Sequence, residues 1–209
     1  MALVTRQLAC TRGDRDLFHS VSVDLQPGEA LRISGKNGSG KTSLLRLLCG
    51  LSSPSAGEVS WNGTNINTLN DQYRSQLTYL GHLSGIKDDL TACENVEMNA
   101  AVAGLPIKTA DAIDALGQIG LADVVNLPTR VLSQGQKKRV ALARLTFCRK
   151  TPLWLLDEPF AALDQQAMEW LIATLNQHLG NDGLLVYSTH QGIELQAKSN
   201  LTIHLDTIC

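Results

Sequence analysis

Short alternating pieces dominate the apolar pattern of the first quarter of the chain. Between residues 3 and 25 apolar and polar positions alternate, with turn signals at Gly13-Asp14 and Pro27-Gly28. This pattern predicts antiparallel strands that lead into a further strand over 30–33. A strand over 58–61 is followed by Asn62-Gly63, a pair typical of a hairpin turn. We therefore expect a small antiparallel β-layer on both sides of the segment 30–51.

Two apolar runs in the last third of the chain show no alternation. They are Leu153-Trp154-Leu155-Leu156 and Leu184-Leu185-Val186-Tyr187, and a helical pattern over 165–179 separates them. Continuous apolar runs of this length are typical of strands that are buried on both faces of a parallel sheet. The order strand, helix, strand predicts a βαβ crossover and an α/β fold.

Helical patterns fill the middle of the chain. After a short strand over 77–80, the capping box Thr91-Ala92-Cys93-Glu94 opens a helix that we expect to end near Gly104. Helical structure continues over 110–119 and resumes at Ser133, whose spacing to Gln136 suits a helix N-terminus. We predict one domain over 1–209, with a helical subdomain at about 87–149.

The segment between the strand at 30–33 and the leucine-rich run at 44–51 matches the pattern G-x-x-x-x-G-K-[ST] of a phosphate-binding P-loop in full. Glycines allow a sharp turn whose N–H groups face phosphate oxygens, and the following helix adds its positive end. We expect Lys41 to reach the β- and γ-phosphates and Thr42 to bind Mg²⁺. The predicted nucleotide-binding residues here are Gly35, Lys36, Asn37, Gly38, Ser39, Gly40, Lys41, Thr42 and Ser43.

Two adjacent carboxylates follow the first buried run. Asp157 and Glu158 are expected at the carboxyl end of a parallel strand, beside the P-loop. Asp157 suits a Mg²⁺-binding aspartate, and Glu158 suits the group that polarises the attacking water. Acidic residues after a strand can also merely cap the next helix, but the P-loop earlier in the chain favours the catalytic interpretation.

Composition and charge narrow the possible partners. Hydrophobic residues make up 44% of the 209 residues, enough for a sizeable core. The formal net charge of −2 and the pI near 6.2 predict no nucleic-acid partner.

The five cysteines are scattered without a C-x-x-C pair, which indicates neither a zinc site nor a disulfide framework. We see neither a signal peptide nor an apolar stretch of about 18 residues, so we expect a cytoplasmic protein.

Five motifs in order resemble the ATP-binding subunit of ABC transporters across essentially the whole chain. After the P-loop come Leu132-Ser133-Gln134-Gly135-Gln136, the run 153–158, Ala162-Leu163-Asp164 and Thr189-His190. The second motif differs from the usual L-S-G-G-Q of that family at Gln134 alone. P-loop kinases and GTPases lack this signature, which makes a kinase the less favoured interpretation.

The resemblance implies a role for further residues and for a second copy of the chain. In this family Ser133, Gly135 and Gln136 contact the nucleotide that is bound to the other subunit, and Asp164 meets the partner across the interface. His190 resembles the histidine that contacts the γ-phosphate and orients Glu158 and the water; a lone histidine would otherwise most often be structural. The resemblance thus implies a homodimer that closes around ATP and Mg²⁺.

Two positions depart from the family pattern. His82 stands where the family usually has a Mg²⁺-contacting glutamine, so it becomes a candidate metal contact. Arg12 stands where an aromatic residue usually stacks on adenine. A guanidinium can also stack, so we assign Arg12 to base binding, with Phe18 as an aromatic alternative nearby.

Several stretches resemble the ATPase subunits of the cytochrome c maturation system, the haem exporter, more closely. They include Tyr79-Leu80-Gly81-His82, Val140-Ala141-Leu142-Ala143-Arg144-Leu145 and Pro152-Leu153-Trp154. The resemblance implies integral membrane partners at the cytoplasmic face of the inner membrane. We expect no direct haem site, because the chain has no C-x-x-C-H. An ABC ATPase for another substrate and a soluble ABC ATPase acting on DNA or ribosomes remain the alternatives.

Overall fold

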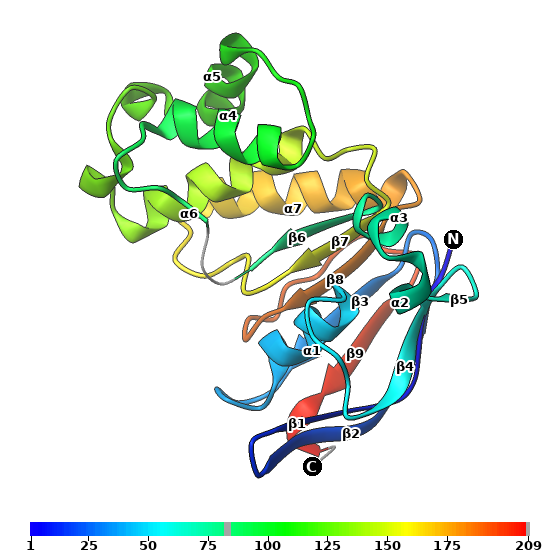
Figure 1. Cartoon of the computed structure of the whole chain (residues 1–209). Helices are drawn as coiled ribbons and strands as arrows, with labels where there is room; N and C mark the ends of the chain where they lie inside the picture. Colours follow the sequence, from blue (N-terminus) through cyan, green and yellow to red (C-terminus); the bar gives the residue numbers. More distant parts are fainter. Residues whose placement is uncertain (82–84, 208–209) are drawn as a thin grey trace. The chain divides into compact units, whose positions relative to one another are not determined.

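The computed structural model describes residues 1–81 and 85–207, which divide into two compact units (Figure 1). The first, here the β unit, comprises Met1–Tyr79, Thr151–Pro159 and Asn176–Cys209. The second, the helical unit, comprises Leu80–Lys150 and Phe160–Leu175. The helical unit thus includes a segment far along the chain from residues 87–149, which no local sequence pattern indicates.

An antiparallel sheet opens the β unit, as the alternating pattern predicts. Its strands run in the order β2-β1-β4-β5. The strands are β1 (Leu3–Arg12), β2 (Arg15–Leu25), β4 (Ala56–Trp61) and β5 (Thr64–Asn65). The hairpin between β4 and β5 turns at Asn62 and Gly63, whose φ angles of 52° and 79° are typical of a type I′ turn.

The second sheet has the order β6-β7-β8-β3-β9 and confirms the predicted α/β fold. Its strands are β3 (Ala30–Ser34), β6 (Leu77–Leu80), β7 (Leu153–Leu156), β8 (Leu184–Ser188) and β9 (Asn200–His204). Strands β7, β8, β3 and β9 pair in parallel. Every residue of β7 and β8 is buried, which explains their continuous apolar sequence. β9 was not predicted: it has only two apolar residues, Leu201 and Ile203, and none of its residues is buried, so its alternating signal is short.

An apolar core lies in the β unit between its sheets and helix α1 (Lys41–Leu48), which contacts β7 and β8. Phe18, Leu45, Ile33 and Leu155 are fully buried in this core. The short helices α2 (Ile66–Leu69) and α3 (Asp71–Arg74) follow β5, and Tyr73 of α3 donates its hydroxyl to the carbonyl of Leu48. This hydrogen bond ties the end of α1, the helix that follows the P-loop, to α3.

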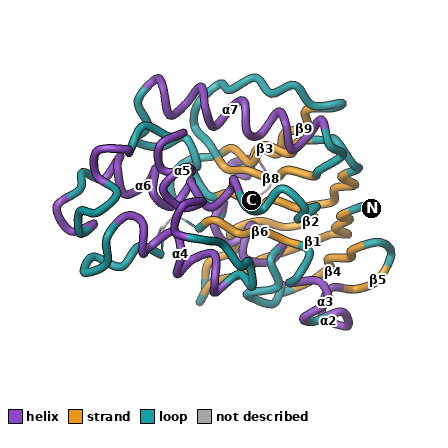
Figure 2. The backbone as a smooth tube through the Cα atoms, turned by 90° about the horizontal axis from the view of Figure 1, so that it is seen from above, coloured by secondary structure: helices purple, strands orange, loops and turns teal. Residues whose placement is uncertain are grey.

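Three helices make up most of the helical unit and contact one another (Figure 2). They are α4 (Ala92–Val102), α5 (Thr109–Gln118) and α6 (Gln134–Ala143). Short 3₁₀ segments cover Ala122–Val124, Thr129–Val131 and Arg144–Thr146. Thr91 and Glu94 form the predicted capping box at the start of α4, and Ser133 and Gln136 form the one at α6.

The fully buried Asn95 organises the entry to α4. Its amide nitrogen donates to the carbonyls of Lys87, Leu90 and Thr91, and its Oδ1 accepts the Lys87 N–H at 2.7 Å. A buried amide is tolerated only when its groups are hydrogen-bonded. Asn95 therefore fixes the loop 87–91 onto the helix.

Helix α7 (Gln165–Gly180) connects β7 to β8 and contributes residues to both units. It matches the helix predicted over 165–179. Among the described helices, α7 included, we find none that is long and apolar enough to cross a membrane.

His178, in the last turn of α7, is buried beside β7. Its ring stacks on Trp154 with ring centroids 4.0 Å apart and an interplanar angle of 9°, and Nε2 donates to the Leu184 carbonyl at 3.2 Å. A Cβ at Gly183 would lie 2.3 Å from the His178 ring, so the site tolerates no side chain there. Burial lowers the pKa of His178 from 6.5 to about 4, against a smaller opposing effect of the Leu184 hydrogen bond.

This burial predicts an acid-sensitive contribution to stability. His178 titrates near 6.5 in the unfolded chain and near 4 in the folded one, so protons bind the unfolded state more tightly. Neutral His178 makes its full contribution to the free energy of unfolding above pH 6.5. As the pH falls toward 4 this contribution is lost, and at pH 5 the free energy of unfolding is lower by about 2 kcal/mol. Urea unfolding at pH 7 and pH 5 should show a smaller pH dependence for His178→Phe than for the parent. The exposed His19→Gln serves as control, and an unchanged pH dependence in His178→Phe would contradict the assignment.

Candidate functional site

The P-loop lies between β3 and α1, and its backbone requires glycine at two places. Gly35 and Gly40 have φ angles of 146° and 102°. A Cβ at Gly35 would lie 2.5 Å from Ser39 Oγ, and one at Gly40 would lie 3.0 Å from the Phe18 ring. The loop is therefore packed against its own serine and against the core.

Lys41 opens α1 and is 7% exposed. Its Nζ donates to the carbonyl of Gly35 at 2.8 Å and to that of Lys36 at 3.1 Å. Nζ also lies 3.0 Å from His190 Nε2 and 3.9 Å from Glu158 Oε1. The lysine ammonium therefore sits at the centre of a polar cluster inside the P-loop.

A chain of hydroxyls and one carboxylate lies beside the lysine. Asp157 follows β7 and is 1% exposed. Its Oδ2 accepts the Thr42 hydroxyl and its Oδ1 accepts the Ser188 hydroxyl, both at 2.7 Å. Ser188 Oγ in turn accepts the N–H of Glu158 at 2.8 Å. A buried carboxylate needs such donors, because burying an unpaired charge is costly.

Glu158 has an unusual backbone conformation next to this chain of hydrogen bonds. Its φ of 50° lies in the left-handed region, which costs a residue other than glycine about 1–2 kcal/mol. Its Oε1 lies 3.2 Å from His190 Nε2. The strained backbone turns the glutamate side chain toward the histidine and the lysine. Such strain is often found at functional sites.

His190 follows β8 and is half-exposed, with 47% of its side chain accessible. Its Nε2 also lies 3.2 Å from Asn37 Oδ1 of the P-loop. One ring nitrogen cannot satisfy a lysine donor and two oxygen acceptors at once. These contacts must therefore rearrange when a ligand engages Lys41.

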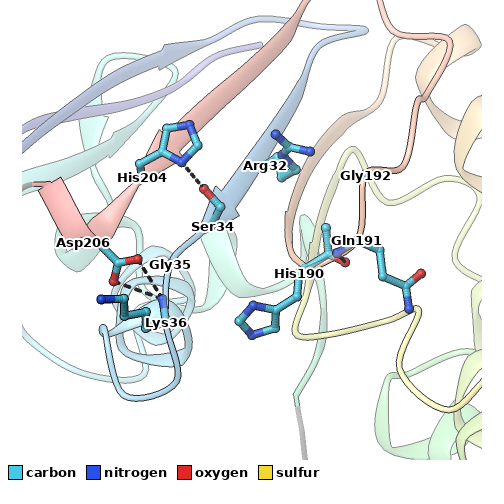
Figure 3. Close-up of a pocket in the computed structure, with 10 residues that line it drawn as sticks. Arg32, Ser34, Gly35, Lys36, His190, Gln191, Gly192, His204 and Asp206 are labelled. Atoms are coloured by element: carbon cyan, nitrogen blue, oxygen red, sulfur yellow. Dashed lines mark hydrogen bonds between the residues drawn. The ribbon is translucent and has the colours of Figure 1, made fainter.

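A pocket of about 470 Å³ lies beside the P-loop and is lined by Gly35 and Lys36 of the loop and by His190 (Figure 3). Asp206 accepts the Lys36 N–H with both carboxylate oxygens at 3.0 Å, and His204 Nδ1 lies 2.6 Å from Ser34 Oγ. Sequence reasoning missed Asp206 and Ser188. The carboxyl end of β8 could have indicated Ser188, whereas Asp206 follows the unpredicted strand β9.

The signature residues lie in the helical unit, at the N-terminus of α6. Ser133 Oγ accepts the Gln136 N–H at 3.2 Å, and Gln136 Oε1 accepts the Ser133 N–H at 2.9 Å. A Cβ at Gly135 would lie 2.6 Å from the Ala162 carbonyl oxygen. Gly135 therefore allows the two backbones to approach closely.

Asp164 has two contacts within its own chain. Its Oδ1 accepts the Ala167 N–H at 2.9 Å at the start of α7, and its Oδ2 lies 3.2 Å from Arg139 Nη1. Asp164 thus caps α7 and forms an ion pair within its own chain, so these contacts alone can account for an aspartate at this position. Its expected contact with a partner subunit stays a prediction.

Neither departure from the family pattern is tested by the structure, so the roles of Arg12 and His82 stay predictions. Arg12 is exposed at the turn between β1 and β2, in the β unit. The aromatic alternative, Phe18, is fully buried against the P-loop backbone, so it offers no face for a base; that suggestion was wrong. His82 lies outside the described residues, and its metal role stays a prediction.

Comparisons with known proteins were made on the sequence and on the fold. The family model described as ABC transporter matches residues 18–161. The cytochrome c biogenesis ATP-binding export protein CcmA of Nitrosomonas europaea is 54% identical over 202 residues, which cover 97% of this chain and 93% of that protein. CcmA of Escherichia coli K12 is 44% identical over 193 residues, covering 92% and 91%.

Solved structures show the same fold. A Pyrococcus furiosus protein described as an ABC transporter ATP-binding protein superposes with a TM-score of 0.83 at 21% identity, over 100% of this chain and 99% of that one. The ATP-binding cassette MJ0796, in a dimeric structure bound to ADP and Pi, superposes with a TM-score of 0.77 at 25% identity, over 90% and 88%. The predicted motifs, the fold and these similarities agree: this chain belongs to the ABC transporter family, as a nucleotide-binding cassette related to the CcmA proteins.

Proposed function

We propose that this chain is the ATP-hydrolysing subunit of an ABC membrane complex that serves cytochrome c biogenesis, by exporting haem or releasing a haem carrier. The observation that carries the proposal is the cluster of Lys41, Thr42, Asp157, Glu158 and His190 within the β unit. The CcmA relatives, aligned over nearly their whole length, support the biological process.

The P-loop residues fit the phosphates of a nucleotide. Ser39 Oγ is buried and has no hydrogen-bond partner among the residues that the structure describes. A phosphate oxygen would accept from it and supply the partner that a buried donor needs. Lys41 Nζ now donates to two loop carbonyls and could exchange them for the stronger, charge-assisted bonds to phosphate.

Thr42 and Asp157 fit Mg²⁺, which prefers hydroxyl, carboxylate and phosphate oxygens. Over residues 1–81 and 85–207 we find no group of three or more acidic, histidine or cysteine side chains that could hold a metal. Mg²⁺ keeps several waters and takes phosphate oxygens, so the two ligands Thr42 and Asp157, which lie in contact, fit an ion that is held together with a nucleotide. When bound, the γ-phosphate would be the electrophile, and Mg²⁺ would neutralise the negative charge that develops on the phosphate oxygens.

Glu158 would accept a proton from the attacking water. Its carboxylate faces His190 and Lys41, and both groups can hold it in place. His190 would donate to Glu158 from Nε2 once Lys41 engages phosphate. Positioning and charge neutralisation account for most catalysis of phosphoryl transfer.

The signature residues would complete a second half-site. We propose that Ser133, Gly135, Gln136 and Asp164 contact the nucleotide and the chain of a second copy, which makes the ATP-bound state a homodimer. The dimeric MJ0796 structure supports this arrangement. We propose integral membrane subunits as further partners, with this chain bound to them at the cytoplasmic face of the inner membrane. Arg12 and Ser43 are the further nucleotide contacts that we propose.

Lys41→Ala should remove most nucleotide affinity, because the phosphates lose their nearest point charge. Equilibrium binding of a fluorescent ATP analogue is the measurement, with the exposed Lys150→Ala as matched control. Equal affinity in Lys41→Ala and the parent would place the phosphates elsewhere.

Glu158→Gln should keep nucleotide and Mg²⁺ binding but lower the hydrolysis rate by about 10²-fold or more, because only the proton acceptor is lost. The ATP-bound dimer should then persist in sedimentation with Mg·ATP. The exposed Glu169→Gln controls for charge. A variant that hydrolyses at the parent rate would assign the proton transfer to another group.

ATP and GTP should bind with affinities that differ by less than about tenfold, or 1.4 kcal/mol. The exposed Arg12 offers a weakly specified stacking surface, so the phosphates supply most of the binding free energy. Competition binding against the same fluorescent analogue measures the ratio. A larger preference for ATP would show that an adenine platform lies outside the residues assigned here.

A further inference from the structure

Ser188 is the last residue of the apolar strand β8 and lies in contact with both Asp157 and Glu158. It is fully buried, and the four residues before it in the strand are buried as well. β8 pairs with β7 on one side, through Leu156 and Tyr187, and with β3 on the other, through Ile33 and Ser188. This double pairing fixes the backbone of Ser188 beside Asp157.

The Ser188 hydroxyl both donates and accepts a hydrogen bond here. A hydroxyl has one proton to donate and lone pairs to accept. Ser188 donates to Asp157 Oδ1 at 2.7 Å and accepts the Glu158 N–H at 2.8 Å. One side chain thus joins the side chain of the proposed Mg²⁺ ligand to the backbone of the proposed water-activating residue.

Each of these bonds constrains a group whose orientation matters for hydrolysis. The Asp157 carboxylate is held on both oxygens, by Thr42 and by Ser188, so its plane cannot rotate freely. The Glu158 N–H is held while that residue adopts a φ of 50°, a conformation that needs support from its surroundings. That conformation turns the Glu158 side chain toward His190 and Lys41.

We infer that Ser188 is a positioning residue for hydrolysis, which sets the geometry between Asp157 and Glu158 without touching the nucleotide. The inference rests on the proposed function of those two carboxylates. Loss of the hydroxyl leaves the P-loop, Lys41 and the fold of β8 in place. It should therefore slow the chemical step while nucleotide binding continues.

The test compares Ser188→Thr, Ser188→Val and Ser188→Ala. Threonine keeps the hydroxyl and valine matches threonine in size without it, so the pair separates hydrogen bonding from packing. We expect kcat to fall at least tenfold in Ser188→Val relative to Ser188→Thr, and in Ser188→Ala relative to the parent. The Kd for the ATP analogue and KM should stay within about threefold. If Ser188→Ala does not fold, the threonine and valine variants decide the question.

Thr5→Val is the matched structural control. Thr5 is a 3% exposed residue of β1 whose hydroxyl also donates once, to the Val21 carbonyl at 3.1 Å, and accepts once, from the Val23 N–H at 3.0 Å. Its loss removes an equally buried pair of hydrogen bonds away from the carboxylates. We expect a lower unfolding midpoint in Thr5→Val with kcat unchanged.

The outcomes separate this inference from the proposed function. If Ser188→Val hydrolyses ATP as fast as Ser188→Thr while Glu158→Gln is inactive, the positioning role is overturned and the proposed function stands. If the Ser188 variants lose affinity and stability together, with kcat retained, the residue is structural and the inference also fails. If Glu158→Gln hydrolyses at the parent rate, the assignment of Glu158 fails and this inference fails with it.

Discussion

Parallel pairing of β3, β7 and β8 is the constraint on which the candidate site depends. The register joins Ile33 to Ser188 and Leu156 to Tyr187, so the three strands end at one edge of the sheet. The P-loop and Asp157 follow directly after β3 and β7, and His190 comes two residues after the end of β8. A slip of one residue would reverse the side chains of a strand and separate the groups. The continuous burial of β7 and β8 is therefore what holds the polar cluster together.

The buried charge of Asp157 shapes the chemistry around it. A carboxylate that is 1% exposed must be compensated by donors, and hydroxyls from Thr42 and Ser188 provide them. Thr42 lies in α1 and Ser188 in β8, whereas Asp157 follows β7. The cost of burying this one charge thus makes the P-loop helix, β7 and β8 interdependent.

Local patterns in the sequence predicted most of the architecture. Features that depend on contacts between distant parts of the chain could not be predicted from them. The alternating strands, the buried runs and both capping boxes have local signals, and each is present. Strand β9 lies at the sheet edge and has only two apolar residues, Leu201 and Ile203, so its alternating signal is too short to predict it or to place Asp206 after it. Asn95 and Ser188 are ordinary polar residues in the sequence, and only tertiary contacts show that their groups are fully used. The motifs named Lys41, Asp157, Glu158 and His190, but not the strained backbone of Glu158.

The order of strands in the second sheet also bears on how the chain reaches its fold during synthesis. β3 is made early, yet both of its neighbours, β8 and β9, come from the last 30 residues of the printed sequence. The β1 and β2 hairpin can form as soon as it emerges, because its contacts are local, whereas Ala30 of β3 must wait for Leu185 and Asn200 to be made. Until then an apolar strand has unpaired edges, and such edges favour aggregation. The edges of β3 therefore stay unpaired in the nascent chain until β8 and β9 have been made.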